Sequence, residues 1–158
     1  MTRSKDLDNN KTPIGFVVCS YADGGGQAMA LEYLEQTELE LMWPTKDIAE
    51  LQNYSSYLDA VQDTNSCANT KIIENYDSDV IKALKEYHTE GTKAGDWCLP
   101  AAGVLMSMKV RYNLGVSENL KDLSNSTSKK IFSSTEYNNL EMWTDFSCPH
   151  FQIIIFCR

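Results

Sequence analysis

Few side chains in this sequence could do metal or nucleophilic chemistry. The chain of 158 residues has five cysteines and two histidines, namely Cys19, Cys67, Cys98, Cys148, Cys157, His88 and His150. No two cysteines have the Cys-x-x-Cys spacing of a zinc or redox site, and their number is odd. The pattern therefore favours free, mostly buried thiols over a metal centre, and we expect neither a metal nor another cofactor.

Sequence motifs of catalysis are also missing. The chain contains no Gly-x-Ser-x-Gly, no Walker loop, no His-Glu-x-x-His and no Gly-x-Gly-x-x-Gly. The triplet Gly24–Gly26 is not followed by Lys-Ser or Lys-Thr, so a turn is a better interpretation than a phosphate loop. His88 is expected to close a helix, where a cation suits the helix dipole. We therefore expect that the chain is not an enzyme.

Charge and hydropathy limit the partners of the chain. The formal net charge is −8, and no stripe of Lys or Arg interrupts it, so nucleic acid and anionic lipid are unfavourable partners. No apolar stretch has the length of a transmembrane helix, and residues 1–12 lack the apolar core of a secretory signal. We expect a flexible lead-in over residues 1–12 and one domain over residues 13–158.

The first half of the chain predicts a hairpin and an irregular segment. Ile14–Cys19 is a short apolar run, and Gln27–Leu34 would return antiparallel to it after a turn at Asp23–Gly26. A helix beginning at Gln27 is the alternative, because Ala, Met, Leu and Glu favour helices. Ile48–Thr64 is rich in Asn, Ser, Tyr and Asp and predicts an irregular surface loop.

The remainder predicts helices followed by strands, an order typical of an α+β domain. One helix is expected to begin at the N-cap Ser78 and another to follow Pro100. The expected helices are Cys67–Tyr76, the stretch after Ser78, Ala101–Tyr112 and a short one at Val116–Leu123. The expected strands are Ile131–Ser134, Met142–Phe146 and Phe151–Cys157.

Three phrases together resemble one family. Lys93–Gly103 reads KAGDWCLPAAG, Ile131–Tyr137 reads IFSSTEY, and Trp143 follows shortly after. This order is similar to that of DUF1566-like domains, which share the C-type-lectin fold with relatives of the formylglycine-generating enzyme and with variable proteins of diversity-generating retroelements. The resemblance implies an α+β, C-type-lectin-like fold with two or three helices packed on small antiparallel sheets.

The resemblance also implies roles for the residues of these phrases. Trp97 and Leu99 would be core anchors, Pro100 would start a helix, and Gly103 would let that helix pack closely. The chain departs from the family pattern at Val104, where the family usually has Glu.

The second phrase would begin the closing sheet. The hydroxyls of Ser133, Ser134 and Thr135 would satisfy backbone groups of loops, and Trp143 would fill the space beneath a ligand-facing surface. Phe132 stands where the family usually has Trp.

In relatives diversified by retroelements, adenines of selected codons are randomised, and the changed residues lie on the exposed face of the C-terminal sheet. Every residue from Thr144 to Arg158 except Gln152 belongs to the set that a mutated Asn codon can encode. The alternative for Phe151–Cys157 is a buried central strand, because its apolar run is continuous.

Both interpretations hold in part if side chains alternate between the two faces of that strand. Phe151, Ile153 and Ile155 would then point inward. The predicted ligand-binding residues are Asn138, Asn139, Leu140, Thr144, Ser147, Cys148, His150, Gln152, Ile154 and Phe156.

These patterns favour a non-catalytic, receptor- or adhesin-type domain that recognises a protein or glycan on a cell surface, with oligomerisation left open. As part of a longer chain, it would act at a cell surface or on a virion. One alternative is a structural module of a surface fibre or pilus without a ligand of its own. Another is an oxidase of the formylglycine-generating type, for which Cys148 and Cys157 would be the only late cysteines.

Overall fold

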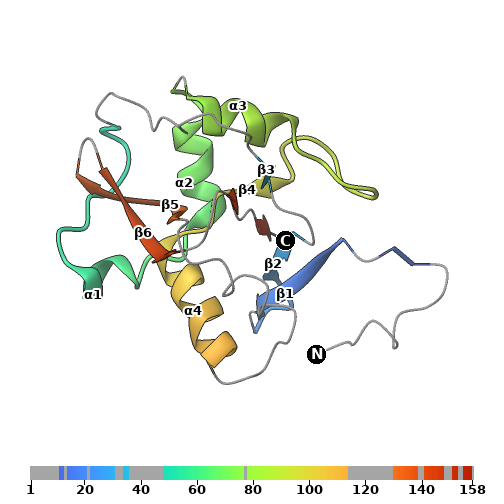
Figure 1. Ribbon diagram of the computed structural model, residues 1–158, viewed down its shortest axis with the longest axis horizontal. Coiled ribbons are helices and arrows are strands. Elements are labelled where there is room, and N and C mark those ends of the chain that lie inside the picture. Colours follow the sequence, from blue (N-terminus) through green and yellow to red (C-terminus); the bar gives the residue numbers. More distant parts are fainter. Residues whose placement is uncertain are drawn as a thin grey trace.

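The chain has a mixed α+β architecture with four helices and small antiparallel sheets among the residues that the structure describes (Figure 1). This computed structural model describes residues 11–12, 14–20, 22–30, 34–35, 48–76, 78–113, 130–138, 141–147, 151–152 and 155–157. The α+β prediction is confirmed at this level. Within these ranges no helix is long and apolar enough to cross a bilayer. Most of the predicted lead-in and the predicted helix Val116–Leu123 lie outside them.

The predicted N-terminal hairpin is present, but its second strand is shorter than the predicted Gln27–Leu34, because Leu34 belongs to a different strand. Strand β1 (Gly15–Ser20) pairs antiparallel with β2 (Gly26–Ala30), so the helical alternative is wrong over the range of β2. The turn between the strands uses Gly24, whose φ of 86° is a left-handed conformation that glycine adopts without strain. The side chain of Asp23 supports the turn, since its Oδ1 accepts a hydrogen bond from the amide of Gly25 at 3.0 Å.

The last segment of the chain is divided between two sheets. Strand β8 (Ile155–Cys157) lies between β2 and β4 (Trp97–Cys98) in the sheet of order β1-β2-β8-β4. Strand β7 (Phe151–Gln152) pairs instead with β3 (Leu34–Glu35). The prediction of one strand over Phe151–Cys157 is therefore wrong. Side-chain alternation holds only within a continuous strand, so it cannot be carried from β7 into β8.

A separate hairpin follows the helices in the sequence. Strand β5 (Lys130–Asn138) pairs antiparallel with β6 (Glu141–Ser147), and both are longer than the predicted strands. The register is irregular between Phe132 and Glu136, where no residue of β5 has a regular partner on β6. This irregular stretch contains the Ser-Ser-Thr part of the second family-like phrase.

Three of the predicted helices are present. They are α2 (Ser66–Ile73), α3 (Asp79–Glu86) and α4 (Ala102–Asn113). Ser78 caps α3 as expected, because its Oγ accepts a hydrogen bond from the amide of Ile81 at 3.2 Å. Pro100 precedes the first residue of α4 by two positions, which places it just before the helix rather than at its opening.

The predicted loop Ile48–Thr64 is only partly irregular and only partly on the surface. It contains a four-residue helix, α1 (Tyr57–Ala60). Ile48 and Ala60 are fully buried, and Leu51 is nearly so. The polar composition of the segment concealed these apolar anchors, because they are spaced irregularly.

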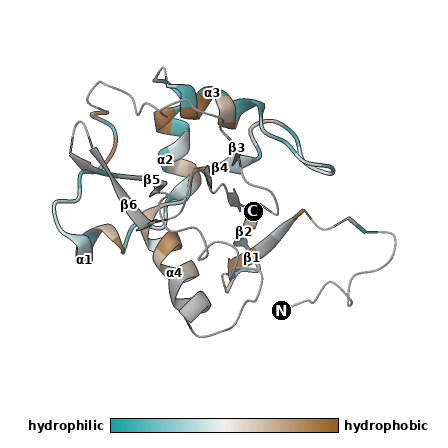
Figure 2. Ribbon diagram, in the orientation of Figure 1, coloured by the Kyte–Doolittle hydropathy of each residue, from teal (hydrophilic) through white to brown (hydrophobic). Residues whose placement is uncertain are grey.

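The main core lies among α2, α3 and β4. Trp97, which is 1% exposed, packs in one cluster with the apolar stripe of α3 and with Ile48, Ile73 and Leu99. Figure 2 shows the division of α3 into brown apolar and teal polar bands, which is typical of a helix with one buried side. The ring of Tyr87 meets Trp97 edge-on, with ring centroids 5.5 Å apart.

A disulfide joins Cys67, in the first turn of α2, to Cys98 of β4. For these two residues the prediction of free thiols is wrong. They are 31 residues apart in the sequence, but the packing of α2 against β4 brings their Cα atoms to 5.2 Å, within the normal range for a disulfide. No sequence motif indicated this proximity.

We expect this disulfide to contribute strongly to stability. Closing a loop of 31 residues restricts the unfolded chain, so the double variant Cys67→Ala/Cys98→Ala should lose about 3 to 4 kcal/mol of unfolding free energy. Urea unfolding measures this loss, and mass mapping of non-reduced peptides should find the Cys67 and Cys98 peptides linked. Separate peptides would show that the pairing is wrong.

Candidate functional site

The N-terminal end of α4 is held by groups from three other segments. The first amides of a helix have no partner within the helix and must find one elsewhere. Here each of three successive amides does so: Ala101 N donates to Ser66 Oγ at 2.8 Å, Ala102 N to Thr135 Oγ1 at 2.9 Å, and Gly103 N to the Asp63 carbonyl at 2.9 Å. The end of α4 is thus fixed to α2, to β5 and to the segment after α1.

Asp63 is the centre of this arrangement. The residue is only 3% exposed, and its carboxylate is fully hydrogen-bonded: Oδ2 accepts from Thr135 Oγ1 at 2.7 Å and Asn69 Nδ2 at 2.8 Å, and Oδ1 accepts from the Asn65 amide at 2.9 Å. These bonds offset the cost of burying a carboxylate. Burial raises the pKa of nearby Tyr54, and the charge of Asp63 raises this pKa further.

Helix α2 contributes a second set of hydroxyl contacts. Thr70 Oγ1 accepts a hydrogen bond from the amide of Leu99 at 3.0 Å and donates one to the carbonyl of Ser66 at 2.8 Å. The Ser66 hydroxyl donates to Gln27 Oε1 at 3.3 Å, which ties strand β2 to the same cluster. We define the polar base as Asp63, Ser66, Thr70 and Thr135 together with the backbone of Leu99–Gly103 that they bind.

Gly103 lets α4 approach the polar base closely. A Cβ atom at this position would lie 2.5 Å from the carbonyl oxygen of Val61 and 2.6 Å from that of Asp63. Both obstacles are backbone atoms, which cannot rotate away as a side chain would. The close packing that the first family-like phrase implied for this glycine therefore has a specific cause.

Strand β5 enters the polar base over four consecutive buried residues, Ser133–Glu136, each at most 1% exposed. The Ser133 Oγ accepts a hydrogen bond from the amide of Thr135 at 2.9 Å, and the amide of Ser134 donates to the Pro100 carbonyl at 2.8 Å. The carbonyl of Glu136 accepts a hydrogen bond from the amide of Tyr54 at 3.1 Å. The Ser134 hydroxyl, in contrast to the role expected for it, has no hydrogen-bond partner among the described residues.

Three of the predicted ligand-binding residues lie on the β5–β6 hairpin. Asn138 is the last residue of β5 and pairs with Glu141, while Thr144 and Ser147 lie on β6. Asn138 follows the buried Glu136 by two residues, whereas Thr144 and Ser147 lie opposite Phe132 and Lys130, at the other end of the buried stretch of β5. The backbone of Trp143 also lies in β6.

The rest of the predicted face is dispersed or lies outside the described residues. Gln152 is on β7, opposite Leu34. Phe156 is on β8, opposite both Ala28 and Trp97, in the interior of the four-stranded sheet. The described members of the face therefore occupy three sheets rather than one. The members outside the described residues are Asn139, Leu140, Cys148, His150 and Ile154.

Other residues singled out from the sequence occupy plain structural positions. Trp97, Leu99 and Pro100 are buried, and they lead directly into the polar base. His88 follows α3 and is exposed, with its Nδ1 3.0 Å from the carbonyl oxygen of Glu86 at the end of that helix. Sequence reasoning missed Asp63, because its partner Thr135 is 72 residues away and no local pattern marks it.

Among the described residues, no group of three or more His, Cys, Asp or Glu side chains could hold a metal ion. Comparison of the chain with protein-family models, with curated proteins and with solved structures finds nothing that matches.

The hydrogen bonds of Thr135 predict a large effect of removing its hydroxyl. Thr135→Val keeps the shape of the side chain but leaves the Ala102 amide and one Asp63 oxygen without this partner, so we expect a loss of about 3 kcal/mol in unfolding free energy. Thr135→Ser keeps the hydroxyl and should lose about 1 kcal/mol or less. Urea unfolding compares the two variants, and equal losses would contradict the assigned role of the hydroxyl.

Proposed function

We propose that the chain is a non-catalytic ligand-binding domain of the receptor or adhesin type with a C-type-lectin-like fold. The β5–β6 hairpin, with the C-terminal segment after it, provides the binding face. The observation that carries the proposal is that β5 contains both buried scaffold residues and a residue of the proposed face. Residues Ser133–Glu136 are buried and include Thr135 of the polar base, and Asn138 at the end of the same strand belongs to the proposed face.

The contact between the two family-like phrases supports the proposed fold. These phrases are about thirty residues apart in the chain, yet the amide of Ser134 donates to the carbonyl of Pro100 and the amide of Ala102 donates to the hydroxyl of Thr135. A chance likeness of two short phrases gives no reason for them to bind one another. Packing of helices with small antiparallel sheets is also what the proposed fold requires.

The architecture of the polar base supports a binding role. A binding face that varies in sequence needs a scaffold whose stability does not depend on the varied side chains. The polar base takes its hydrogen bonds from Asp63, Ser66, Thr70 and Thr135, none of which belongs to the proposed face. Substitutions along the hairpin beyond Glu136 therefore leave these bonds in place.

The disulfide supports a location outside the reducing cytoplasm. Disulfides persist in secreted proteins, in the periplasm and on cell or virion surfaces, and are rare where thiols are kept reduced. The link between Cys67 and Cys98 suits a domain displayed on a surface as part of a longer chain. A protein or a glycan on a cell surface is the proposed class of ligand.

Retroelement diversification is the proposed source of variation on this face. The test is to sequence the 3′ end of the gene, with its flanking DNA, across many isolates. We expect substitutions to concentrate between Asn138 and Cys157 in codons that derive from Asn codons, and a template copy of this region to lie near a reverse-transcriptase gene.

The codons of Lys93–Gly103 serve as the control within the same gene, because these residues lead into the polar base and should stay constant. If the segment from Asn138 to Cys157 varies no more than this control, the diversified face is contradicted. A structural module of a fibre or pilus would then be the better explanation.

A further inference from the structure

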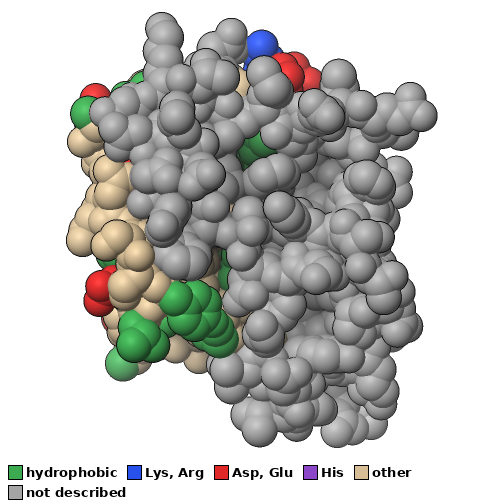
Figure 3. Space-filling model, turned by 60° about the vertical axis from the view of Figure 1, so that its left-hand side comes forward, with side chains coloured by type: hydrophobic (Ala, Val, Ile, Leu, Met, Phe, Trp, Pro, Cys, Tyr) green, Lys and Arg blue, Asp and Glu red, His purple; other side chains and the backbone are tan. Residues whose placement is uncertain are grey.

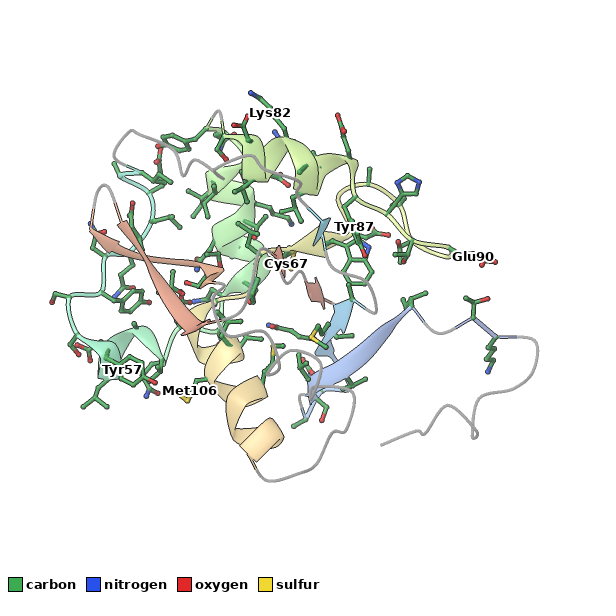
Figure 4. The ribbon with its side chains drawn as sticks, in the orientation of Figure 1. Tyr57, Cys67, Lys82, Tyr87, Glu90 and Met106 are labelled. Atoms are coloured by element: carbon green, nitrogen blue, oxygen red, sulfur yellow. A yellow bond between two sulfur atoms is a disulfide. The ribbon has the colours of Figure 1, made fainter. Side chains whose placement is uncertain are left out.

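The disulfide between Cys67 and Cys98 lies largely inside the protein. Figure 3 shows one face of the surface, on which hydrophobic side chains gather at the lower left and basic and acidic side chains lie together at the top. The disulfide is set apart from such surface groups, since Cys98 is 7% exposed and Cys67 is only partly exposed. Figure 4 shows Cys67 near the centre of the molecule. A thiol of the chain itself is therefore better placed than one in solution to react with this disulfide.

A third cysteine stands on a neighbouring strand. Cys98 of β4 lies opposite Ile155 of β8, and Cys157 follows Ile155 by two residues on the same strand. Because successive residues of a strand alternate between its two faces, positions 155 and 157 belong to one face, and position 98 belongs to it as the direct partner of position 155. Cys98 and Cys157 are thus diagonal neighbours on one face of the sheet.

The beginning of α2 meets this face of the sheet. Cys157 lies opposite Gln27 of β2. The Gln27 side chain is buried, its Oε1 accepts a hydrogen bond from Ser66 Oγ at 3.3 Å, and its Nε2 donates one to the carbonyl of Thr64 at 3.2 Å. Cys67 is the next residue after Ser66, and α2 also contacts β8 directly. The register therefore brings Cys157 to the part of the sheet that the disulfide-bonded end of α2 contacts.

The spacing of the cysteines decides what the third one can do. Diagonal neighbours in an antiparallel pair have Cα atoms about 7 to 8 Å apart, whereas the Cα atoms of a disulfide are about 7 Å apart or less. A bond between Cys98 and Cys157 therefore requires a backbone movement of about 1 Å. Cys157 is the last residue of β8, so few ladder hydrogen bonds oppose such a movement.

Cys19 does not have this relation to the disulfide. It also stands opposite Gln27, but on strand β1, at the other side of β2. In the sheet order β1-β2-β8-β4, two strands lie between Cys19 and Cys98, which is a distance of about 14 Å at the usual strand spacing. Cys19 is therefore a matched control for Cys157, because it has the same register in the same sheet but is out of reach of the disulfide.

Exchange between a thiol and a disulfide needs no further reactant. A cysteine loses its proton, the thiolate attacks one sulfur of the disulfide, a new S–S bond forms, and the other sulfur leaves as a thiolate that takes up a proton. One thiol and one disulfide are present before and after the step, so no oxidant or reductant is consumed. Attack on Cys98 makes Cys67 the leaving group. Cys67 is partly exposed and lies in the first turn of α2, where water and the first amides of the helix stabilise a thiolate.

We propose that Cys67, Cys98 and Cys157 form a three-cysteine exchange site, in which Cys157 displaces Cys67 from Cys98. The exchange moves the covalent link from α2 and β4 to β4 and β8, and it leaves Cys67 as a thiol. The attachment of α2 to the sheet is then reversible without any change in the oxidation state of the chain. This inference does not rest on the proposed function, and position 157 is then a fixed one within the segment that is proposed to vary.

The test incubates the full, disulfide-bonded chain without reductant at about pH 8.5, near the ordinary pKa of a cysteine thiol, so that thiolate is present. Free thiols are then blocked with N-ethylmaleimide, and mass spectrometry of non-reduced peptides identifies the linked and the blocked cysteines. Cys157→Ser removes the attacking thiol and leaves the pair of Cys67 and Cys98 intact. Cys19→Ser and Cys148→Ser each remove another thiol and are the controls. Thermal unfolding checks that the variants fold.

We expect the wild type to yield linked Cys98 and Cys157 peptides together with blocked Cys67. Cys157→Ser should lower the blocking of Cys67 by about tenfold or more, while Cys19→Ser and Cys148→Ser should leave it unchanged. The exchange site is overturned if Cys67 stays unblocked in the wild type, or if it is blocked to the same extent in Cys157→Ser.

A second variant tests the placement of Cys157 without the exchange step. In Cys67→Ser, Cys98 has lost its partner, and oxidised glutathione lets it pair with a cysteine within reach, each new disulfide reducing one glutathione disulfide to two thiols. We expect Cys98 to pair with Cys157. Pairing with Cys19 or Cys148, or a mixed disulfide with glutathione alone, would contradict the proposed site.

Discussion

The amide groups at the beginning of α4 lie in the interior, away from water, and must find hydrogen-bond acceptors there. An unsatisfied buried amide costs about 1 to 3 kcal/mol, so three successive ones would consume much of the net stability of a domain this size. The chain meets this constraint with Ser66, Thr135 and the carbonyl of Asp63, which come from three distant segments. The positions of α2, of β5 and of the segment after α1 all depend on this shared requirement.

The same constraint bears on the two roles that we propose for the β5–β6 hairpin, one in the polar base and one in the binding face. Its first strand supplies Thr135 to the polar base, where the hydroxyl both donates to Asp63 and accepts from Ala102. The strand then ends at Asn138, beyond any of these bonds. The disulfide between Cys67 and Cys98 joins residues next to Ser66 and Leu99 of the base, where α2 meets β4. We therefore propose that side chains of the hairpin outside Ser133–Glu136 can change without breaking the hydrogen bonds of the polar base.

Local features of the fold could be predicted from the sequence, whereas most of the long-range ones could not. The cap at Ser78 and the apolar stripe after it identified α3, and the turn at Asp23–Gly26 identified the first hairpin. The disulfide, the division of the last segment into β7 and β8, and the role of Asp63 depend on partners far away in the sequence, which no periodicity reveals. The four-residue helix α1 was missed because it is too short to show a helical pattern. For the candidate site, the phrases around Pro100 and Thr135 were recognised, but their mutual contact was not foreseen.

The central claim is that one hairpin supplies both a fixed base and a substitutable face. A saturation library of the full chain on yeast, sorted for resistance to trypsin, tests it most directly by comparing positions Ser133–Glu136 with Asn138, Thr144 and Ser147. The account predicts that most substitutions in the first group abolish resistance and that most in the second group retain it. If the second group were as intolerant as the first, the hairpin would be a structural element throughout, and the separation of base and face would be contradicted.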